Sequence, residues 1–173
     1  PGESLVLIGD TTGWLGQSIY LREIHGREEG APPPVDLVAE KRNGDLVRGL
    51  IGAGKVSACH DLGDGGLLVA AAEMALASGL GLELAAGPSG MRPDAWWFGE
   101  DQARYLVSTS SPEAILAAAR AAGVPAQAIG TTTAGGPAVA LTVAGGGTIS
   151  LTELRHAHEH WLPGFMAAPV RKG

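Results

Sequence analysis

The stretch His60-Asp61-Leu62-Gly63-Asp64-Gly65-Gly66 joins two segments with different hydrophobic patterns. Before it, residues 56–59 form a short run typical of a β-strand. After it, residues 67–80 are apolar almost all round, with Glu73 as their only charge. A helix with that pattern is usually buried against a sheet. The stretch therefore predicts a tight turn that leads from a strand into a buried helix.

Further apolar runs predict the other strands of this sheet. Residues 5–8 are continuously apolar and end at Gly9, and residues 104–109 alternate apolar and polar side chains. Between Gly-rich turns we expect three more short strands, at residues 126–129, 138–143 and 148–149. The turns are frequent because the chain contains 27 Gly and 11 Pro.

Helical spacing appears at four more places. We expect helices at residues 19–24 and 35–51, the second weakened but not broken by Gly44. A third begins at Ser111-Pro112-Glu113, with the Ser hydroxyl as its cap, and the last begins with a Ser150–Glu153 capping box. The element order is roughly βααβαβ followed by βαβββα, with no residues assigned to the sixth element. Strict alternation is missing, so an α+β fold is favoured over a doubly wound sheet.

Composition sets the class of molecule. The 173 residues suffice for one domain, or one domain and a small lobe, and 45% of them are hydrophobic. The net charge of −6 and the lack of a basic stripe argue against nucleic acid as a partner. No apolar run reaches the length of a membrane span.

The single cysteine, Cys59, excludes an internal disulfide and a thiolate zinc cluster. A reducing cytoplasm is the simplest location, and we expect Cys59 to be a buried packing residue. The first residues lack the pattern of a signal peptide. They also lack Met, so either the initiator was removed or the chain was cut from a longer one.

Residues 60–66 are the first candidate site. Three glycines let a backbone approach a ligand closely, and free N–H groups at a helix start favour an anion such as phosphate. In this interpretation His60 or Asp61 faces the ligand and Asp64 caps the helix. A plain turn with Asp64 as a structural cap is equally well supported by the spacing alone.

Two other polar stretches are weaker candidates. Glu100, Asp101 and Gln102 precede a strand and could bind a polar ligand or a metal, although solvated polar residues are common there and are favoured. Residues 11–18 form a Gly-rich loop before a helix, with Gln17 and Ser18 as possible phosphate donors. For this loop, too, a plain turn is favoured.

The remaining candidates favour structural roles. His156 and His160 share a helix face, as two metal ligands would, but no HExxH order is present and a solvated face is favoured. Trp96 and Trp97 are expected to pack a loop rather than stack on a base. The serines near residue 110 lie in no nucleophile elbow.

Several of these stretches, taken in order, resemble a known family. The similarity covers nearly the whole chain and is carried by residues 5–9, 15–26, 57–67, 80–81, 98–105 and 151–155. They resemble the C-terminal domain of phosphoribosylformylglycinamidine synthase, the large synthetase subunit of purine biosynthesis. The wider superfamily includes aminoimidazole ribonucleotide synthetase, selenophosphate synthetase and a hydrogenase maturation protein.

The resemblance implies an α+β fold with helices packed on a mixed sheet, as in the C-terminal domain of aminoimidazole ribonucleotide synthetase. Residues 1–173 would be one domain, the second B domain of a longer chain with two A-plus-B pairs. The parent enzyme uses ATP and Mg²⁺ to activate the amide oxygen of formylglycinamide ribonucleotide as an iminophosphate. Ammonia from a glutaminase partner displaces the phosphate and gives the amidine. Multi-subunit forms add a small bridging subunit.

The family's catalytic His and its Mg²⁺ ligands come mainly from A domains, so the resemblance implies neither in this chain. In the first B domain, the position matching residues 100–102 helps bind substrate. In the second, the matching face looks toward an auxiliary nucleotide site that is often considered structural. The ligand-binding candidates are Asp61, Asp64, Gly65, Gly66, Gln17, Ser18, Glu100, Asp101 and Gln102.

Two alternatives stay open. The chain could be a catalytically silent structural repeat, which scaffolds the enzyme and binds nothing relevant to catalysis. It could also be the equivalent domain of another superfamily member, such as selenophosphate synthetase. Residues 20–26 and 99–104 favour the purine enzyme over the second alternative.

Overall fold

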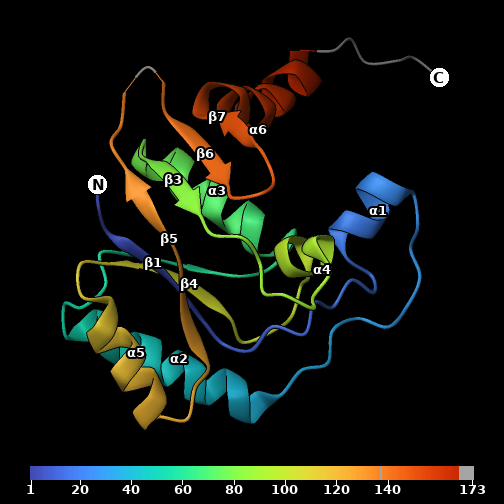
Figure 1. Ribbon diagram of the computed structural model, residues 1–173. Helices are drawn as coiled ribbons and strands as arrows, with labels where there is room; N and C mark the ends of the chain where they lie inside the picture. Colours follow the sequence, from blue (N-terminus) through green and yellow to red (C-terminus); the bar gives the residue numbers. More distant parts are fainter. Residues whose placement is uncertain (137, 168–173) are drawn as a thin grey trace.

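A mixed β-sheet organises the molecule (Figure 1). The computed structural model describes residues 1–136 and 138–167, and within them seven strands pair in the order β2-β4-β1-β5-β3-β6-β7. Neighbouring strands are antiparallel except β3 and β6, which are parallel. The strands are β1 (Ser4–Ile8), β2 (Ala58–Asp61), β3 (Gly81–Leu84), β4 (Tyr105–Thr109), β5 (Ala126–Thr133), β6 (Ala140–Val143) and β7 (Thr148–Ser150).

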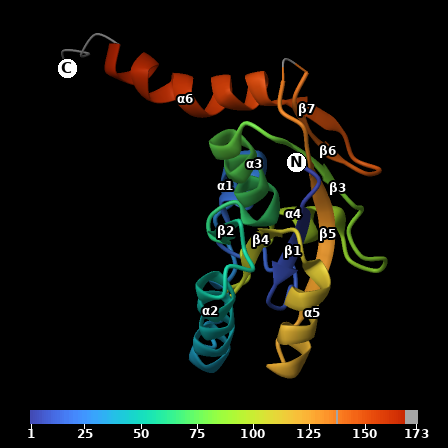
Figure 2. The same cartoon turned by 90° about the vertical axis from the view of Figure 1, so that its left-hand side faces the viewer.

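Helices cover both faces of the sheet. They are α1 (Ile19–His25), α2 (Leu37–Gly52), α3 (Gly66–Ser78), α4 (Pro93–Phe98), α5 (Pro112–Ala121) and α6 (Leu151–Ala167). In Figure 1, α3 and α4 lie above the central strands, and α2 and α5 lie below them. Figure 2 shows α6 crossing the top of the molecule and projecting past α3 and α1. Among the described residues, no helix combines the length and the apolar character that crossing a bilayer requires.

The two helical layers create two hydrophobic cores. Along β1, Leu5 and Leu7 face the core between the sheet and helices α3 and α4. Val6 and Ile8 face the opposite core, between the sheet and helices α2 and α5. A strand buried on both faces must be apolar at every position, which is why residues 5–8 lack alternation. This arrangement confirms the α+β class and the mixed sheet.

The capping box before α6 is confirmed. The Ser150 hydroxyl accepts the N–H of Glu153 at 3.1 Å, and the Glu153 carboxylate accepts the N–H of Ser150 at 3.0 Å. At α5, however, Ser111 makes no side-chain cap. The Thr109 hydroxyl instead accepts the Ser111 N–H at 3.0 Å, so the expected capping hydroxyl was wrong.

Two elements differ from expectation. β3 occupies the sixth place in the order, to which the sequence assigned no residues. α4 was not predicted: Trp96 and Trp97 lie buried on this short helix rather than in a loop. Pro93 in its first turn, followed by Asp94, was the available signal.

The strand before residues 60–66 was placed two residues too early. β2 spans Ala58–Asp61, so His60 and Asp61 belong to the strand and the turn begins after them. Cys59 is exposed, and the expectation that it is buried was wrong. The reason is that β2 is the edge strand of the sheet, and alternation along an edge does not fix which side chains are covered.

Candidate functional site

Residues 99–104, between α4 and β4, form a buried polar loop. Glu100, Asp101 and Arg104 are all buried, and Arg104 is only 1% exposed. The favoured interpretation of these side chains as solvated was therefore wrong. Buried charges persist only when they are paired and hydrogen-bonded, so the partners of these three groups define what the loop does.

The Glu100 carboxylate closes two helix starts at once. Its Oε1 accepts the N–H of Gly65, the N-cap of α3, at 2.8 Å, and the N–H of Ile19, the first residue of α1, at 2.9 Å. Helix N-termini carry partial positive charge and unpaired N–H groups, which favour an anion. The chain's own carboxylate thus occupies the position that the sequence suggested for a phosphate.

Asp101 does the same for the Gly-rich loop at residues 11–18. Its carboxylate accepts the backbone N–H of Thr12 at 3.1 Å and of Gly13 at 3.0 Å, and it also accepts the Thr12 hydroxyl. A longer bond of 3.4 Å comes from the N–H of Trp14. Several successive N–H groups that converge on one carboxylate form a nest, the usual backbone arrangement for an anion.

Arg104 holds the loop from within. Its guanidinium donates to the carbonyl oxygens of Asp101 at 3.0 Å and Gly99 at 2.6 Å, and to the Thr11 hydroxyl at 3.2 Å. One of its nitrogens lies 3.8 Å from the Asp101 carboxylate. Burial lowers the pKa of Arg104, while the carboxylates of Asp101 and Glu100 act in the opposite direction. The sequence gave no sign of this burial, because Arg before a strand is ordinarily exposed.

Helix α2 supplies two further contacts that the sequence did not reveal. Ala103 has a left-handed backbone with φ of 58°. The Glu40 carboxylate accepts its N–H at 2.9 Å, and the Asn43 side chain donates to its carbonyl at 2.9 Å. Such a conformation costs about 1–3 kcal/mol in a non-Gly residue, so it requires fixed neighbours of this kind.

Gly65 and Gly66 are required by packing. Both have left-handed backbones, with φ of 80° and 68°. A Cβ on Gly66 would lie 2.5 Å from the carbonyl oxygen of Gly99, and one on Gly65 would lie 2.5 Å from the Val69 side chain. The glycines therefore let this turn approach residues 98–99 and α3 of the same chain.

The other candidates face outward or support α1. Asp61 and Asp64 are exposed, and α3 has no side-chain cap, so Asp64 does not fill that role. The pKa of nearby Arg22 is raised chiefly by its hydrogen bond with Glu23, and the Asp64 carboxylate adds to this in the same direction. Ser18 is the buried N-cap of α1 and accepts the N–H of Leu21 at 3.2 Å.

Gln17 and Gln102 both bond to the chain itself. The Gln17 amide donates to the carbonyl oxygens of Glu28 at 3.0 Å and Gly30 at 3.1 Å. The Gln102 amide donates to the carbonyl of Glu100 at 3.2 Å. Beside α1, a hollow of about 200 Å³ is lined by Gln17, Ser18, Arg22, Arg27 and Glu28.

Metal binding depends on which His, Cys, Asp and Glu side chains lie together. Across residues 1–136 and 138–167, no three His, Cys, Asp or Glu side chains come together as a metal site would need. His156, His158 and His160 are exposed on α6, as expected of a solvated face, and the rings of His156 and His160 stack at 4.6 Å.

Curated proteins of high similarity are much longer than this chain. It is 60% identical over 167 residues to the phosphoribosylformylglycinamidine synthase subunit PurL of Bradyrhizobium sp. strain BTAi1. It is 56% identical over 167 residues to the subunit of the same name from Rhodopseudomonas palustris strain BisB5. Each match covers 95% of this chain and 22% of the relative, so the chain spans about a fifth of their length.

Solved structures and a family description agree on the fold. Phosphoribosylformylglycinamidine synthase II from Thermotoga maritima superimposes with a TM-score of 0.70 at 22% identity, over 89% of this chain and 26% of that one. The T. maritima PurL structure described as complexed with FGAR gives 0.72, over 89% and 28%. Residues 1–141 match the family described as "AIR synthase related protein, C-terminal domain". The chain therefore belongs to the AIR-synthase-related C-terminal domain family.

Proposed function

We propose that this chain is the C-terminal domain, the second B domain, of a phosphoribosylformylglycinamidine synthase. The parent enzyme would convert formylglycinamide ribonucleotide to the amidine with ATP and glutamine-derived ammonia, in de novo purine biosynthesis. The observation that carries the proposal is the 60% identity to a subunit of that name over 95% of the chain. The same observation disfavours an equivalent domain of selenophosphate synthetase.

The domain's contribution would be to position ligand-facing surfaces rather than to perform chemistry. Glu100 and Asp101 fill the backbone anion sites at the glycine-rich corners, so a phosphate could use these amides only after displacing a buried carboxylate. Ligand contacts would instead come from the outward-facing candidates, chiefly Asp61, Asp64 and Gln17. Ser18, Gly65, Gly66 and Gln102 would support their positions.

ATP, Mg²⁺ and protein partners belong to the proposed parent enzyme. The T. maritima relatives include structures described as complexes with ATP and with FGAR, and one described as PurLQS. A glutaminase subunit and a small bridging subunit are the partners we propose, in the cytoplasm. As the family resemblance implies, Mg²⁺ would be held mainly by the A domains of the longer polypeptide.

The test uses the full-length polypeptide that carries this domain. With ATP, Mg²⁺ and an ammonium salt, we expect ADP release that depends on formylglycinamide ribonucleotide and yields the amidine by mass. With selenide in place of the ribonucleotide, no ATP should be consumed, whether to ADP or to AMP. The reverse pattern would reject the purine assignment and favour selenophosphate synthesis.

The same assay separates a ligand-facing domain from a silent repeat. Asp64→Ala removes an exposed carboxylate without a role in packing, and Glu113→Ala on α5 is a matched control on the other face of the sheet. We expect Asp64→Ala to raise the KM for ATP or for the ribonucleotide, with an unchanged melting temperature. Identical kinetics for both variants would favour the silent repeat.

A further inference from the structure

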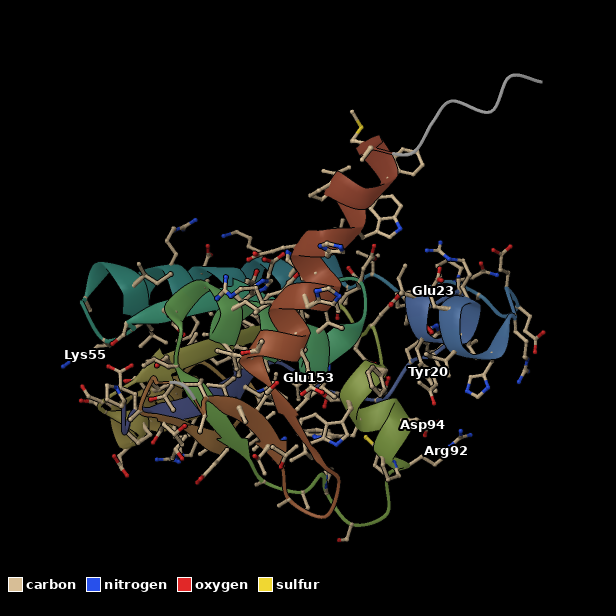
Figure 3. The ribbon with its side chains drawn as sticks, turned by 90° about the horizontal axis from the view of Figure 1, so that it is seen from above. Tyr20, Glu23, Lys55, Arg92, Asp94 and Glu153 are labelled. Atoms are coloured by element: carbon tan, nitrogen blue, oxygen red, sulfur yellow. The ribbon has the colours of Figure 1, made fainter. Side chains whose placement is uncertain are left out.

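The last turns of α6 leave the body of the domain. Leu151 is buried and Leu154 packs against the core under α3, but every described residue from Arg155 onward is exposed. Four large apolar side chains are among them: Trp161 is 67% exposed, Leu162 57%, Phe165 63% and Met166 73%. In Figure 3, α6 runs from Glu153 near the centre of the molecule to a point well outside it.

The projecting part of α6 is at best marginally stable without a partner. Isolated helices shorter than about 12–15 residues are marginal in water, and Pro inside a helix costs about 3 kcal/mol. The projecting part of α6 contains Pro163, and its described residues from Trp161 onward are all exposed. Two of its apolar side chains nevertheless lie together on one side of the helix. The ring centroids of Trp161 and Phe165 are 5.2 Å apart and the ring planes make an angle of 9°. A surface with these properties fits a partner that covers it.

An apolar groove continues this surface onto the body. A cavity of about 450 Å³ lies between α3 and α6, lined by Leu68, Val69, Ala72, Phe98, Leu154 and Ala157 among others. Ala157 lies one helical turn before Trp161, so the groove and the exposed side chains adjoin along α6. The groove could receive apolar side chains of a partner, and the exposed side chains of α6 could enter a groove on that partner, as in helix-in-groove recognition.

The comparisons with longer relatives bear on which molecule covers the groove and the exposed side chains of α6. The domain family matches residues 1–141 and stops before α6, whereas the PurL relatives match over 95% of the chain, which takes in most of α6. The helix is thus shared with long polypeptides of which this domain is about a fifth. We propose that the groove and the four exposed apolar side chains of α6, Trp161, Leu162, Phe165 and Met166, dock another domain of the same polypeptide. This inference rests on the proposed function, in which the chain is one domain of that polypeptide.

The docking surface adjoins the buried polar loop. Val69, in the groove, is the residue that a Cβ on Gly65 would meet. Phe98, also in the groove, stacks on Tyr20 of α1 at 4.7 Å, and Figure 3 shows Tyr20 pointing from α1 toward α4. A docked domain would therefore lie close to α3 and α1, the two helices whose N-terminal N–H groups donate to Glu100.

Hydrogen exchange in the full-length polypeptide tests the proposal. We expect amides of residues 155–167 to be protected, and Trp161→Glu with Phe165→Glu to reduce that protection by about tenfold or more. The matched control is His156→Glu with His160→Glu, which adds the same charges on exposed positions of the same helix and should leave protection unchanged. Trp161→Leu with Phe165→Leu keeps apolar anchors and should retain most of the protection.

Three outcomes would overturn the proposal. Unprotected amides in the unmodified polypeptide would show that nothing covers α6. If the Trp161→Glu, Phe165→Glu variant and its histidine control lose the same protection, the apolar side chains of α6 are not the contact. Protection that rises with protein concentration would indicate a second copy as the occupant. The activity assay is independent: amidine formation with an unprotected α6 would reject docking alone, and protection without that activity would reject the proposed function alone.

Discussion

The loop at residues 99–104 buries polar side chains, whereas the end of α6 exposes apolar ones. In the loop, the buried carboxylates of Glu100 and Asp101 and the guanidinium of Arg104 all have partners within the chain. On α6, Trp161 and Phe165 stack on each other and remain 67% and 63% exposed. The loop joins segments that lie far apart in the sequence, whereas the described residues of α6 from Arg155 onward are all exposed.

This contrast changes where an external molecule should be sought. The glycine-rich corners resemble anion sites in sequence, but internal carboxylates complete them. The last helix shows nothing unusual in its sequence pattern, yet its apolar side chains Trp161, Leu162, Phe165 and Met166 are left exposed. A glycine-rich helix start therefore predicts that its backbone N–H groups bind an anion. Only the structure shows whether that anion is a side chain of the protein itself.

The largest effect should come from removing the guanidinium that holds the loop. Breaking a buried ion pair by deleting one partner costs about 3–5 kcal/mol, so Arg104→Ala should lower the free energy of unfolding by that order. Urea denaturation measures it. Arg120→Ala, an exposed arginine on α5, should change stability by less than about 0.5 kcal/mol. Similar small losses in both variants would mean that the loop is less integral than its contacts indicate.

A smaller loss is expected from the turn that the loop packs against. Gly66→Ala places a side chain in a left-handed conformation, at a cost of about 1–3 kcal/mol, and against the Gly99 carbonyl. Gly63→Ala is the matched control, because a Cβ there meets nothing within 4 Å. Thermal melting should show a clear decrease for Gly66→Ala only. If both variants melt together, the close approach of the turn to residues 98–99 has no energetic weight.

The smallest of the three effects distinguishes an internal anion from a ligand contact. Glu100→Gln keeps the shape but removes the charge that accepts from Gly65 and Ile19, and should cost about 1–2 kcal/mol. The KM values for ATP and the ribonucleotide should not change, and Glu113→Gln on α5 serves as control. A raised KM without loss of stability would show that Glu100 contacts ligand and that the contrast with α6 is wrong.

Local patterns predicted those features that depend on neighbouring residues. The capping box at Ser150 and Glu153 and the apolar run of β1 needed only short-range spacing, and both are confirmed. Cys59 was wrongly expected to be buried, and the helix α4 that carries Trp96 and Trp97 was missed, although their packing role is confirmed. Both errors concern which strand lies at the edge and which short helix is covered. Neither is encoded within a few residues of the position concerned.

The sequence by itself determined the α+β class, most of the elements and the family, because hydrophobic periodicity and ordered motifs are local properties of a chain. The partners of Glu100, Asp101 and Arg104 were decided by the tertiary structure alone. Those partners come from residues 11–19, 61–66 and 99–104, which only the folded sheet brings together. The exposure of the last turns of α6 was likewise a tertiary result, since an apolar stripe has the same spacing whether it is covered or not.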